Sequence, residues 1–216
     1  MKTIVALLLV LAAGFGAIYQ GTDGFQALTT EAARRLAIAR QPRPLPPVTI
    51  EFASGEPRTL AQALRSDGRV TIVNFIYTRC NTICSVMGGE FQQLQRELQA
   101  SGMAHRVRLL SISFDPADQA AQLAAYARQM QAQPEVWQFA AVPDGQQRRA
   151  LLAAFGIVVV PAALGEFEHN AAFHIVDADG LLAQIVDYDA PQAALHYALA
   201  ASRSRLAGPA SADGHS

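Results

Sequence analysis

The chain has 216 residues, of which 51% are hydrophobic and 16% charged, and its formal net charge at pH 7 is −1. This composition suits one globular domain of ordinary size together with an additional apolar segment. A near-neutral charge balance excludes the electrostatic footprint of a nucleic-acid-binding protein, so we expect no nucleic-acid partner.

The apolar excess lies at the N-terminus. Lys2 precedes an uncharged run from Thr3 to Tyr19, which is typical either of a secretory signal cleaved near residues 12–17 or of an uncleaved membrane anchor. The apolar run continues past these small residues, so we interpret residues 1–20 as an anchor or signal segment and favour the anchor. Both alternatives export the rest of the chain. We therefore expect a single-pass protein of the inner (cytoplasmic) membrane, with its folded domain on the periplasmic side, where two cysteines can form a disulfide.

Residues 21–47 are predicted to connect this segment to the folded domain. Thr29-Thr30-Glu31 is a helix-start pattern and predicts a juxtamembrane helix. Residues 41–47 (QPRPLPP) contain four prolines in seven positions, which predicts an extended, semi-rigid linker. This linker is the expected domain boundary.

The folded domain is expected to begin with a short strand at residues 48–52 and a helical turn at 60–64. Residues 70–77 (VTIVNFIY) then form a near-continuous apolar, β-branched run, which is typical of a strand buried on both faces. Residues 85–99 follow with apolar side chains at mostly helical spacing.

Cys80 and Cys84, the two cysteines of the chain, fall between this strand and this helix. Backbone N–H groups and the positive end of the helix dipole meet at such a junction, and both favour thiolate over thiol. Spacing of four residues in the first turn places the two sulfurs on one side, close enough to share an ion or form a disulfide. We interpret them as reactive or metal-binding thiols rather than structural cysteines. The pair alone does not separate redox from metal chemistry.

Further elements complete an α/β pattern. Strands are predicted at 107–114, 136–140, 172–176 and 182–188, and helices at 117–131, 145–155 and 191–202. Asp179-Gly180 predicts a tight hairpin turn between the last two strands. This order predicts a mixed sheet with helices on both faces. We expect a thioredoxin-like domain over residues 48–202, preceded by one N-terminal hydrophobic helix and followed by a disordered tail at 203–216.

A histidine near the thiols would favour a metal site. His215 lies in the tail and His196 in the last helix, so both are expected at the surface. His105 precedes a strand at the edge of the sheet opposite the cysteines. His169 stands just before the first strand of the terminal hairpin, where the chain of a thioredoxin-like sheet faces the cysteine loop, whereas His174 lies within that strand. His169 is therefore the preferred third ligand.

Three motifs in order, YTRCNTIC (77–84), SISFDPAD (111–118) and HNAAFHIVDADG (169–180), resemble the Sco/SenC family of copper-binding assembly factors for cytochrome c oxidase. The resemblance covers roughly residues 48–200. It implies copper ligands at Cys80, Cys84 and His169, and it matches Asp115 to the aspartate of the family's Asp-Pro motif. An N-terminal anchor before a thioredoxin-like domain also fits the family.

The chain departs from the family pattern near the ligands. Prolines common beside the family's cysteines are replaced by Asn81 and Ser85. His174 occupies a position where the family tends to carry an aromatic residue, and is either a competing ligand or a strand residue facing away from the metal. Asp115 is expected either beside the ligands, where it orients His169 or tunes the thiols, or as a loop aspartate that caps the following helix.

Two thiolates and one imidazole suit copper. Cu(I) is soft and accepts low coordination, whereas structural zinc would normally take four ligands. Cu(II) could bind if a further oxygen or nitrogen ligand joins the set. We therefore expect a copper ion, with Cu(I) favoured.

The leading prediction is a copper metallochaperone for the binuclear copper site of cytochrome c oxidase. Its partners would be the copper-site subunit and other periplasmic copper carriers or thiol reductants. The alternative is an exported thiol–disulfide oxidoreductase that uses Cys80 and Cys84 to reduce the oxidised copper-ligand cysteines of that subunit. A peroxiredoxin-like peroxidase is less favoured, because the chain has Thr78-Arg79-Cys80 in place of Thr-x-x-Cys. Whether the protein is an enzyme is left open by these alternatives.

Overall fold

The computed structural model describes residues 2–21, 29–79, 83–163 and 166–206. The chain divides into two compact units, Met1–Gln41 and Pro42–Ser216. The first unit contains α1 (Lys2–Gly21), where the hydrophobic helix is predicted, and α2 (Thr30–Arg40). Thr29 caps α2, since its hydroxyl accepts a 3.0 Å hydrogen bond from the backbone N–H of Ala32. Within the ranges given above, no helix is both long enough and apolar enough to cross a membrane.

The second unit alternates strands and helices. Its helices are α3 (Leu60–Arg65), α4 (Ile83–Ala100), α5 (Ala120–Gln129), α6 (Gly145–Phe155) and α7 (Pro191–Leu206), with a 3-10 turn η1 (Met103–His105). Its strands are β1 (Arg43–Pro44), β2 (Thr49–Phe52), β3 (Pro57–Thr59), β4 (Val70–Ile76), β5 (Val107–Ser113), β6 (Trp137–Ala141), β7 (Val159–Pro161), β8 (Phe167–His169), β9 (Ala172–Val176) and β10 (Leu181–Asp187).

Eight of these strands form one sheet in the order β1-β10-β9-β4-β5-β6-β2-β3. β4, β5 and β6 are parallel, and the strands on either side of them are antiparallel. β7 and β8 form a separate two-stranded antiparallel sheet. The predicted mixed sheet is therefore confirmed, with its three parallel strands at the centre.

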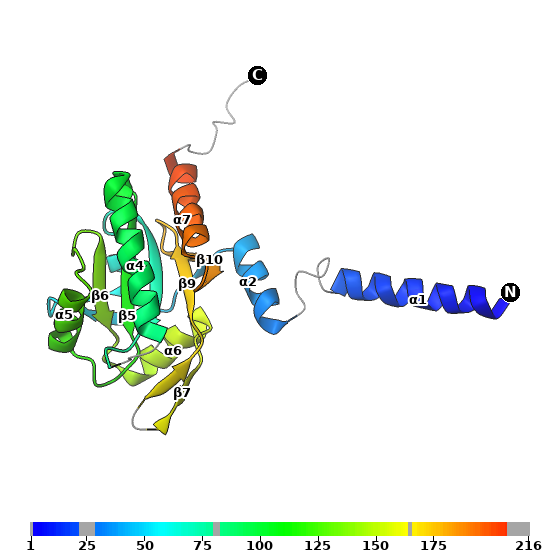
Figure 1. Cartoon of the computed structure of the whole chain (residues 1–216), viewed down its shortest axis with the longest axis horizontal. Helices are drawn as coiled ribbons and strands as arrows, with labels where there is room; N and C mark the ends of the chain where they lie inside the picture. The colour runs from blue at the N-terminus through cyan, green and yellow to red at the C-terminus, as the bar shows by residue number, and fades with distance from the viewer. Residues whose placement is uncertain (1, 22–28, 80–82, 164–165, 207–216) are drawn as a thin grey trace, which may run out of the picture. The chain divides into compact units, whose positions relative to one another are not determined.

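β4 is the central strand, and all seven of its residues are buried. One face of the sheet packs against α4, α5 and α7, so that Ile72 lies in a cluster with Phe91 of α4 and Ala194 of α7. α4 and α7 lie on this same side of the sheet in Figure 1. On the opposite face, Phe75 meets Phe155 of α6 with 5.0 Å between ring centroids. A strand covered by helices on both faces must be apolar throughout, which explains the uninterrupted run in the sequence.

The hairpin from β9 to β10 turns at the predicted Asp-Gly. The Asp177 carboxylate accepts hydrogen bonds from the backbone N–H groups of Asp179 and Leu181. Gly180 has φ +80°, which a residue without a side chain adopts without strain. The hairpin prediction is confirmed.

Two predicted domain limits differ from the structure. β1, inside the Pro-rich linker, pairs with β10 through Arg43↔Leu182 and Pro44↔Leu181, so the folded unit begins at residue 42 rather than 48. α7 continues to Leu206, whereas the prediction ended the helix at 202. The rest of the predicted tail, residues 207–216, lies outside the described residues.

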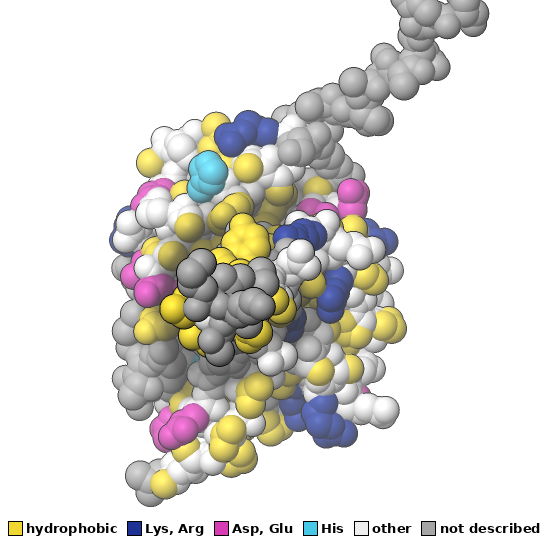
Figure 2. All heavy atoms as spheres, turned by 90° about the vertical axis from the view of Figure 1, so that its right-hand side faces the viewer, with side chains coloured by type: hydrophobic (Ala, Val, Ile, Leu, Met, Phe, Trp, Pro, Cys, Tyr) yellow, Lys and Arg dark blue, Asp and Glu magenta, His cyan; other side chains and the backbone are white. Residues whose placement is uncertain are grey.

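Charged side chains of both signs are interspersed with apolar and uncharged ones on the face shown in Figure 2. This mixture agrees with the formal net charge of −1.

Candidate metal and thiol site

The predicted thiols belong to the junction between β4 and α4. β4 ends at Ile76 and α4 begins at Ile83, so the chain turns from strand to helix where the sequence predicts it. Cys80 lies outside the described residues. Cys84 is in the first turn of α4, and its side chain lies outside them as well. The described side chains around this junction form the frame of the candidate site.

His169 lies beside the end of β4. Its imidazole packs edge-on against Phe114, with ring centroids 4.9 Å apart, and against Tyr77, with centroids 6.3 Å apart. Tyr77 directly follows β4 and precedes Cys80 by three positions. The predicted third ligand is therefore adjacent to the segment that leads into the first thiol.

Tyr77 holds the strand of His169 in this place. Its buried side chain donates a 2.6 Å hydrogen bond from the hydroxyl to Glu166 Oε2, and the hydroxyl oxygen accepts a 3.4 Å hydrogen bond from the backbone N–H of Phe167. The rings of Tyr77 and Phe167 are also in edge contact, with centroids 5.3 Å apart. Tyr77 therefore packs in the core and also ties the two-stranded sheet to the end of β4.

The imidazole of His169 is in an environment that favours its neutral form. Burial lowers the pKa of His169, because the charged ring would lose hydration. Its Nδ1 lies 3.0 Å from the carbonyl oxygen of Asn170. A carbonyl oxygen only accepts, so Nδ1 carries the proton and the lone pair is on Nε2. A neutral imidazole with this tautomer can donate Nε2 to a metal ion.

Asp115 contacts the segment before the thiols rather than His169. Its carboxylate is buried and accepts a 2.7 Å hydrogen bond from Arg79 and a 2.8 Å hydrogen bond from the backbone N–H of Ala117. The first of these bonds raises the pKa of Arg79. α5 begins at Ala120, so Asp115 closes a turn ahead of that helix and does not cap it. Arg79 is thus held in an ion pair rather than simply solvated.

Asp118 is a residue of this frame that the sequence did not single out. Its side chain is buried and accepts hydrogen bonds from the backbone N–H of Thr78 (2.8 Å), the Thr78 hydroxyl (2.6 Å) and the Ser113 hydroxyl (2.6 Å). These contacts hold the chain two residues before Cys80 against the end of β5. The signal in the sequence is the Asp115-Pro-Ala-Asp118 motif, which ends in this second aspartate.

The other described histidines lie away from this frame. His174 is fully buried in β9, contacts the rings of Phe75 and Phe155, and donates from Nε2 to the Phe155 carbonyl at 3.1 Å. It is a core residue between the sheet and α6. His196 is exposed, as predicted, and His105 is exposed as well. His215 lies in the tail that the structure does not describe.

In the part of the chain that the structure describes, no three His, Cys, Asp or Glu side chains are close enough together to hold a metal ion. The predicted ligand set combines His169 with Cys80 and Cys84, whose side chains lie outside this part of the chain. Two thiolates and an imidazole can bind a soft cation, and the same two thiols can exchange with a disulfide.

The mixed sheet, the helices on both faces and the strand-to-helix position of the cysteines define a thioredoxin-like domain. A sequence model of the SCO1/SenC family matches residues 52–203. The chain therefore belongs to the SCO1/SenC family.

One curated relative is the SCO1 protein homolog of Bacillus subtilis (strain 168), which is 31% identical over 116 residues. The match covers 52% of this chain and 59% of that protein, so the chain spans about three fifths of the relative's length.

Solved structures share the fold. BsSco, a member of the Sco family of cytochrome c oxidase assembly proteins in which a disulfide switch has been identified, is similar with a TM-score of 0.64 and 24% identity. The match covers 76% of this chain and 95% of BsSco. Bradyrhizobium japonicum ScoI with copper bound is similar with a TM-score of 0.59 and 21% identity, over 73% of this chain and 98% of ScoI.

Proposed function

We propose that this protein is a copper metallochaperone. It would hold copper, as cargo, at Cys80, Cys84 and His169, and assist assembly of the binuclear copper site of cytochrome c oxidase. Cu(I) is the favoured ion, because two thiolates and one imidazole form a soft set of low coordination number. Cu(II) would require a further oxygen or nitrogen ligand.

The position and protonation of His169 carry this proposal. The histidine is held against Tyr77 at the end of the strand that leads to Cys80, and its lone pair lies on Nε2. A general thiol–disulfide exchange needs no such imidazole, whereas a third metal ligand must be fixed and neutral. Membership of the SCO1/SenC family and the copper-bound state of ScoI support the same assignment.

We assign Asp115 a positioning role. It would act through Arg79, whose guanidinium it holds in an ion pair. Arg79 directly precedes Cys80 in the sequence. A cation kept near a cysteine favours the thiolate, which is the form that binds copper and the form that exchanges with disulfides. The alternative role of orienting His169 has no direct contact to support it among the described side chains.

A thiol–disulfide oxidoreductase is the second candidate function, and the disulfide switch identified in BsSco favours keeping it. In that reaction the thiolate of one cysteine attacks a partner disulfide and forms a mixed disulfide. The second cysteine then attacks the mixed disulfide and releases the partner as a dithiol. Cys80 and Cys84 lose two electrons and two protons, and the partner gains them.

Copper loading tests the leading proposal. The reduced full chain should bind one Cu(I), and X-ray absorption should report sulfur and nitrogen ligands. His169→Ala should lose most of the copper affinity, whereas His196→Ala, the matched change of an exposed histidine, should bind as the unchanged protein does. Equal copper affinity in the two variants would contradict the ligand assignment.

Cellular assembly separates the two functions. Both need the cysteines, so only His169 discriminates between them. If copper delivery is the role, His169→Ala fails to assemble the oxidase copper site although its thiols still reduce a model disulfide. An assembly-competent His169→Ala protein that cannot retain copper would favour the reductase. The reduction rate of the same variant must be measured, because His169 could also act as a base.

We also propose that residues 1–20 export the folded unit and attach it to the membrane. The support is the charge pattern of Lys2 followed by an uncharged run. Mass spectrometry of the membrane-extracted protein measures the mature N-terminus. An intact N-terminus is expected for an anchor, whereas a mature N-terminus between Ala13 and Gly21 would mean that the segment is a cleaved signal.

A further inference from the structure

A cavity of about 380 Å³ lies beside the first residues of β6, and His169 is not among the residues that line it. β2 pairs with β6 only through Glu51↔Ala141 and Phe52↔Ala140, and the N–H of Ala53 then donates to the Phe139 carbonyl at 2.9 Å. The chain next turns away at Gly55, which has φ +81°. The hairpin thus leaves the sheet before it reaches the first residues of β6, and the sheet edge beside them forms one wall of the cavity.

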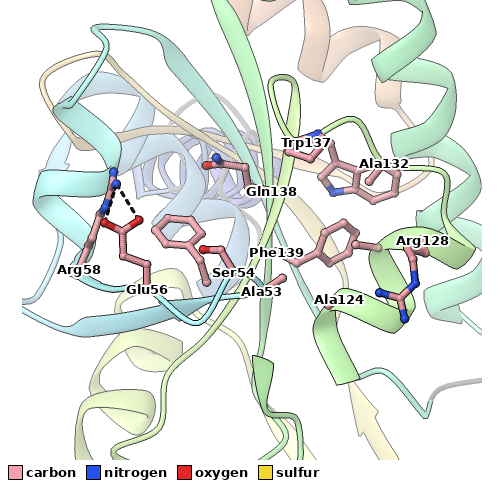
Figure 3. Close-up of a pocket in the computed structure, with 13 residues that line it drawn as sticks. Ala53, Ser54, Glu56, Arg58, Ala124, Arg128, Ala132, Trp137, Gln138 and Phe139 are labelled. Carbon is pink, nitrogen blue, oxygen red and sulfur yellow. Dashed lines mark hydrogen bonds and ion pairs between the residues drawn. The ribbon is translucent and has the colours of Figure 1, made fainter. Parts of the chain in front are cut away.

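Small side chains on α5 leave the space open. Ala124 lines it from the helix and Ala132 from the following loop, while the rings of Trp137 and Phe139 lie at its base (Figure 3). Ala127 of α5 also lines the cavity. A leucine at any of the three alanine positions would fill part of this space. The cavity has room for roughly a dozen water-sized groups, and its lining is mainly apolar.

The charges at the mouth are unequal. Glu56 accepts two hydrogen bonds from Arg58, at 2.9 and 2.8 Å, on one side of the cavity (Figure 3). Arg128 lies on the other side, and within the described ranges its guanidinium makes no hydrogen bond or ion pair. Two arginines and one glutamate leave one net positive charge on the lining.

We propose that this cavity binds a small amphipathic organic anion, with a flat apolar body and a single carboxylate. The apolar body would contact the alanine wall and the aromatic base, where burial of apolar area supplies the affinity. The carboxylate would pair with Arg128 at the mouth, since Glu56 already neutralises Arg58. None of the proposed copper ligands lines the cavity, so this inference is independent of the proposed function.

The probe for this site is 2-naphthoate, compared with its neutral analogue 2-naphthamide. The chain has a single tryptophan, so the one indole N–H signal in the NMR spectrum of the isotope-labelled full chain reports on Trp137. Calorimetry of the same samples gives the dissociation constants. We expect saturable binding of naphthoate that shifts the indole signal, with naphthamide bound about tenfold more weakly.

Variants test the two halves of the ligand separately. Arg128→Gln should weaken naphthoate binding about tenfold and leave naphthamide binding unchanged. Arg149→Gln removes an exposed arginine of α6 outside the cavity and should alter neither. Ala127→Leu should abolish the binding of both probes, whereas Ala121→Leu, on the exposed side of α5, should not.

Three results would overturn the proposal. The first is an indole signal that does not move with naphthoate. The second is equal binding of naphthoate to the Arg128→Gln and Arg149→Gln proteins, which would leave an apolar cavity with no anion preference. The third is naphthoate binding that survives Ala127→Leu in a protein whose circular dichroism and thermal unfolding match those of Ala121→Leu. If Ala127→Leu fails to fold, Ala124→Leu takes its place in the same comparison.

Discussion

The hydroxyl of Tyr77 lies 2.6 Å from the Glu166 carboxylate, and this bond joins the end of the central strand to the two-stranded sheet that carries His169. The same ring contacts Phe167 and His169. The bond therefore holds together two segments that are about 90 residues apart in the chain. Tyr77, on the first of these segments, precedes Cys80 by three positions.

Removing this hydroxyl should loosen the histidine without unfolding the protein. Tyr77→Phe keeps the ring contacts and loses one hydrogen bond, so we expect unfolding to cost about 1 kcal/mol less. We also expect Cu(I) to be bound several-fold more weakly, measured by competition with a chelator. Tyr197→Phe, in which the exposed ring of α7 loses its hydroxyl, is the matched control. Unchanged copper affinity in Tyr77→Phe would mean that the bond does not position His169.

His169 and His174 should show opposite effects on copper binding and stability. His174 is fully buried and packs against Phe75 and Phe155, so His174→Ala should destabilise the fold by about 3 kcal/mol. The folded fraction of the His174→Ala protein should still bind copper. His169→Ala should keep most of the stability and lose copper. Urea unfolding and copper stoichiometry on both variants check this, and the reverse pattern would show that the wrong histidine is assigned.

Asp118 should matter to both stability and thiol reactivity. Asp118→Ala leaves the buried Ser113 hydroxyl and the partly buried donors of Thr78 without their acceptor, which should cost about 3 kcal/mol in urea unfolding. The thiols should then react faster with a disulfide reagent, because the chain before Cys80 is no longer held. Asp189→Ala, a change of an exposed aspartate, should alter neither value. A stability loss with no change in thiol reactivity would limit Asp118 to a structural role.

Asp67 should make the fold sensitive to acid. Burial alone would raise the pKa of Asp67, but the hydrogen bond from Arg69 and the charge of Arg108 outweigh it and lower the pKa. The ionised form is thus favoured in the folded state. Its contribution is complete above the ordinary pKa of 3.8 and is lost as the pH falls through the lower, folded-state value.

Urea unfolding of the unchanged protein and of Asp67→Asn at stepped pH values checks this. The stability difference between the two proteins should be constant near neutral pH and should shrink below about pH 4. The difference should be modest, because the Asp67 side chain is 35% exposed and solvent screens its charges. A difference that grows as the pH falls would contradict the stated direction.

The sequence predicted the elements that have a strong local pattern. β4 follows from its continuous apolar run. The bounds of α6 at Gly145–Phe155 follow from helical periodicity and from the capping residues Asp144 and Gly156 at its two ends. α5 was predicted from Ala117 but begins at Ala120, because the alanine-rich pattern hid a turn in which Asp118 N–H bonds to the Asp115 carbonyl. β7 and β8 are not among the predicted strands, since three-residue strands are too short to show alternation.

The candidate site was harder to predict in full. Cys80, Cys84 and His169 stand out by residue type and motif, but Asp118 and Tyr77 act through contacts with segments far along the chain. Sequence spacing cannot indicate which backbone N–H a buried carboxylate will accept from. Asp115 shows the same limit, because its partner Arg79 lies 36 residues away.

Both rims of the eight-stranded sheet end in short, exposed, proline-containing strands. β1 supplies Arg43 and Pro44 at one rim, and β3 supplies Pro57, Arg58 and Thr59 at the other. Proline offers no N–H to an incoming strand, and at the β1 rim the charge of Arg43 also repels a second copy of the same rim. The sheet is therefore a poor template for edge-to-edge aggregation, which favours solubility of the folded unit when many copies are crowded together.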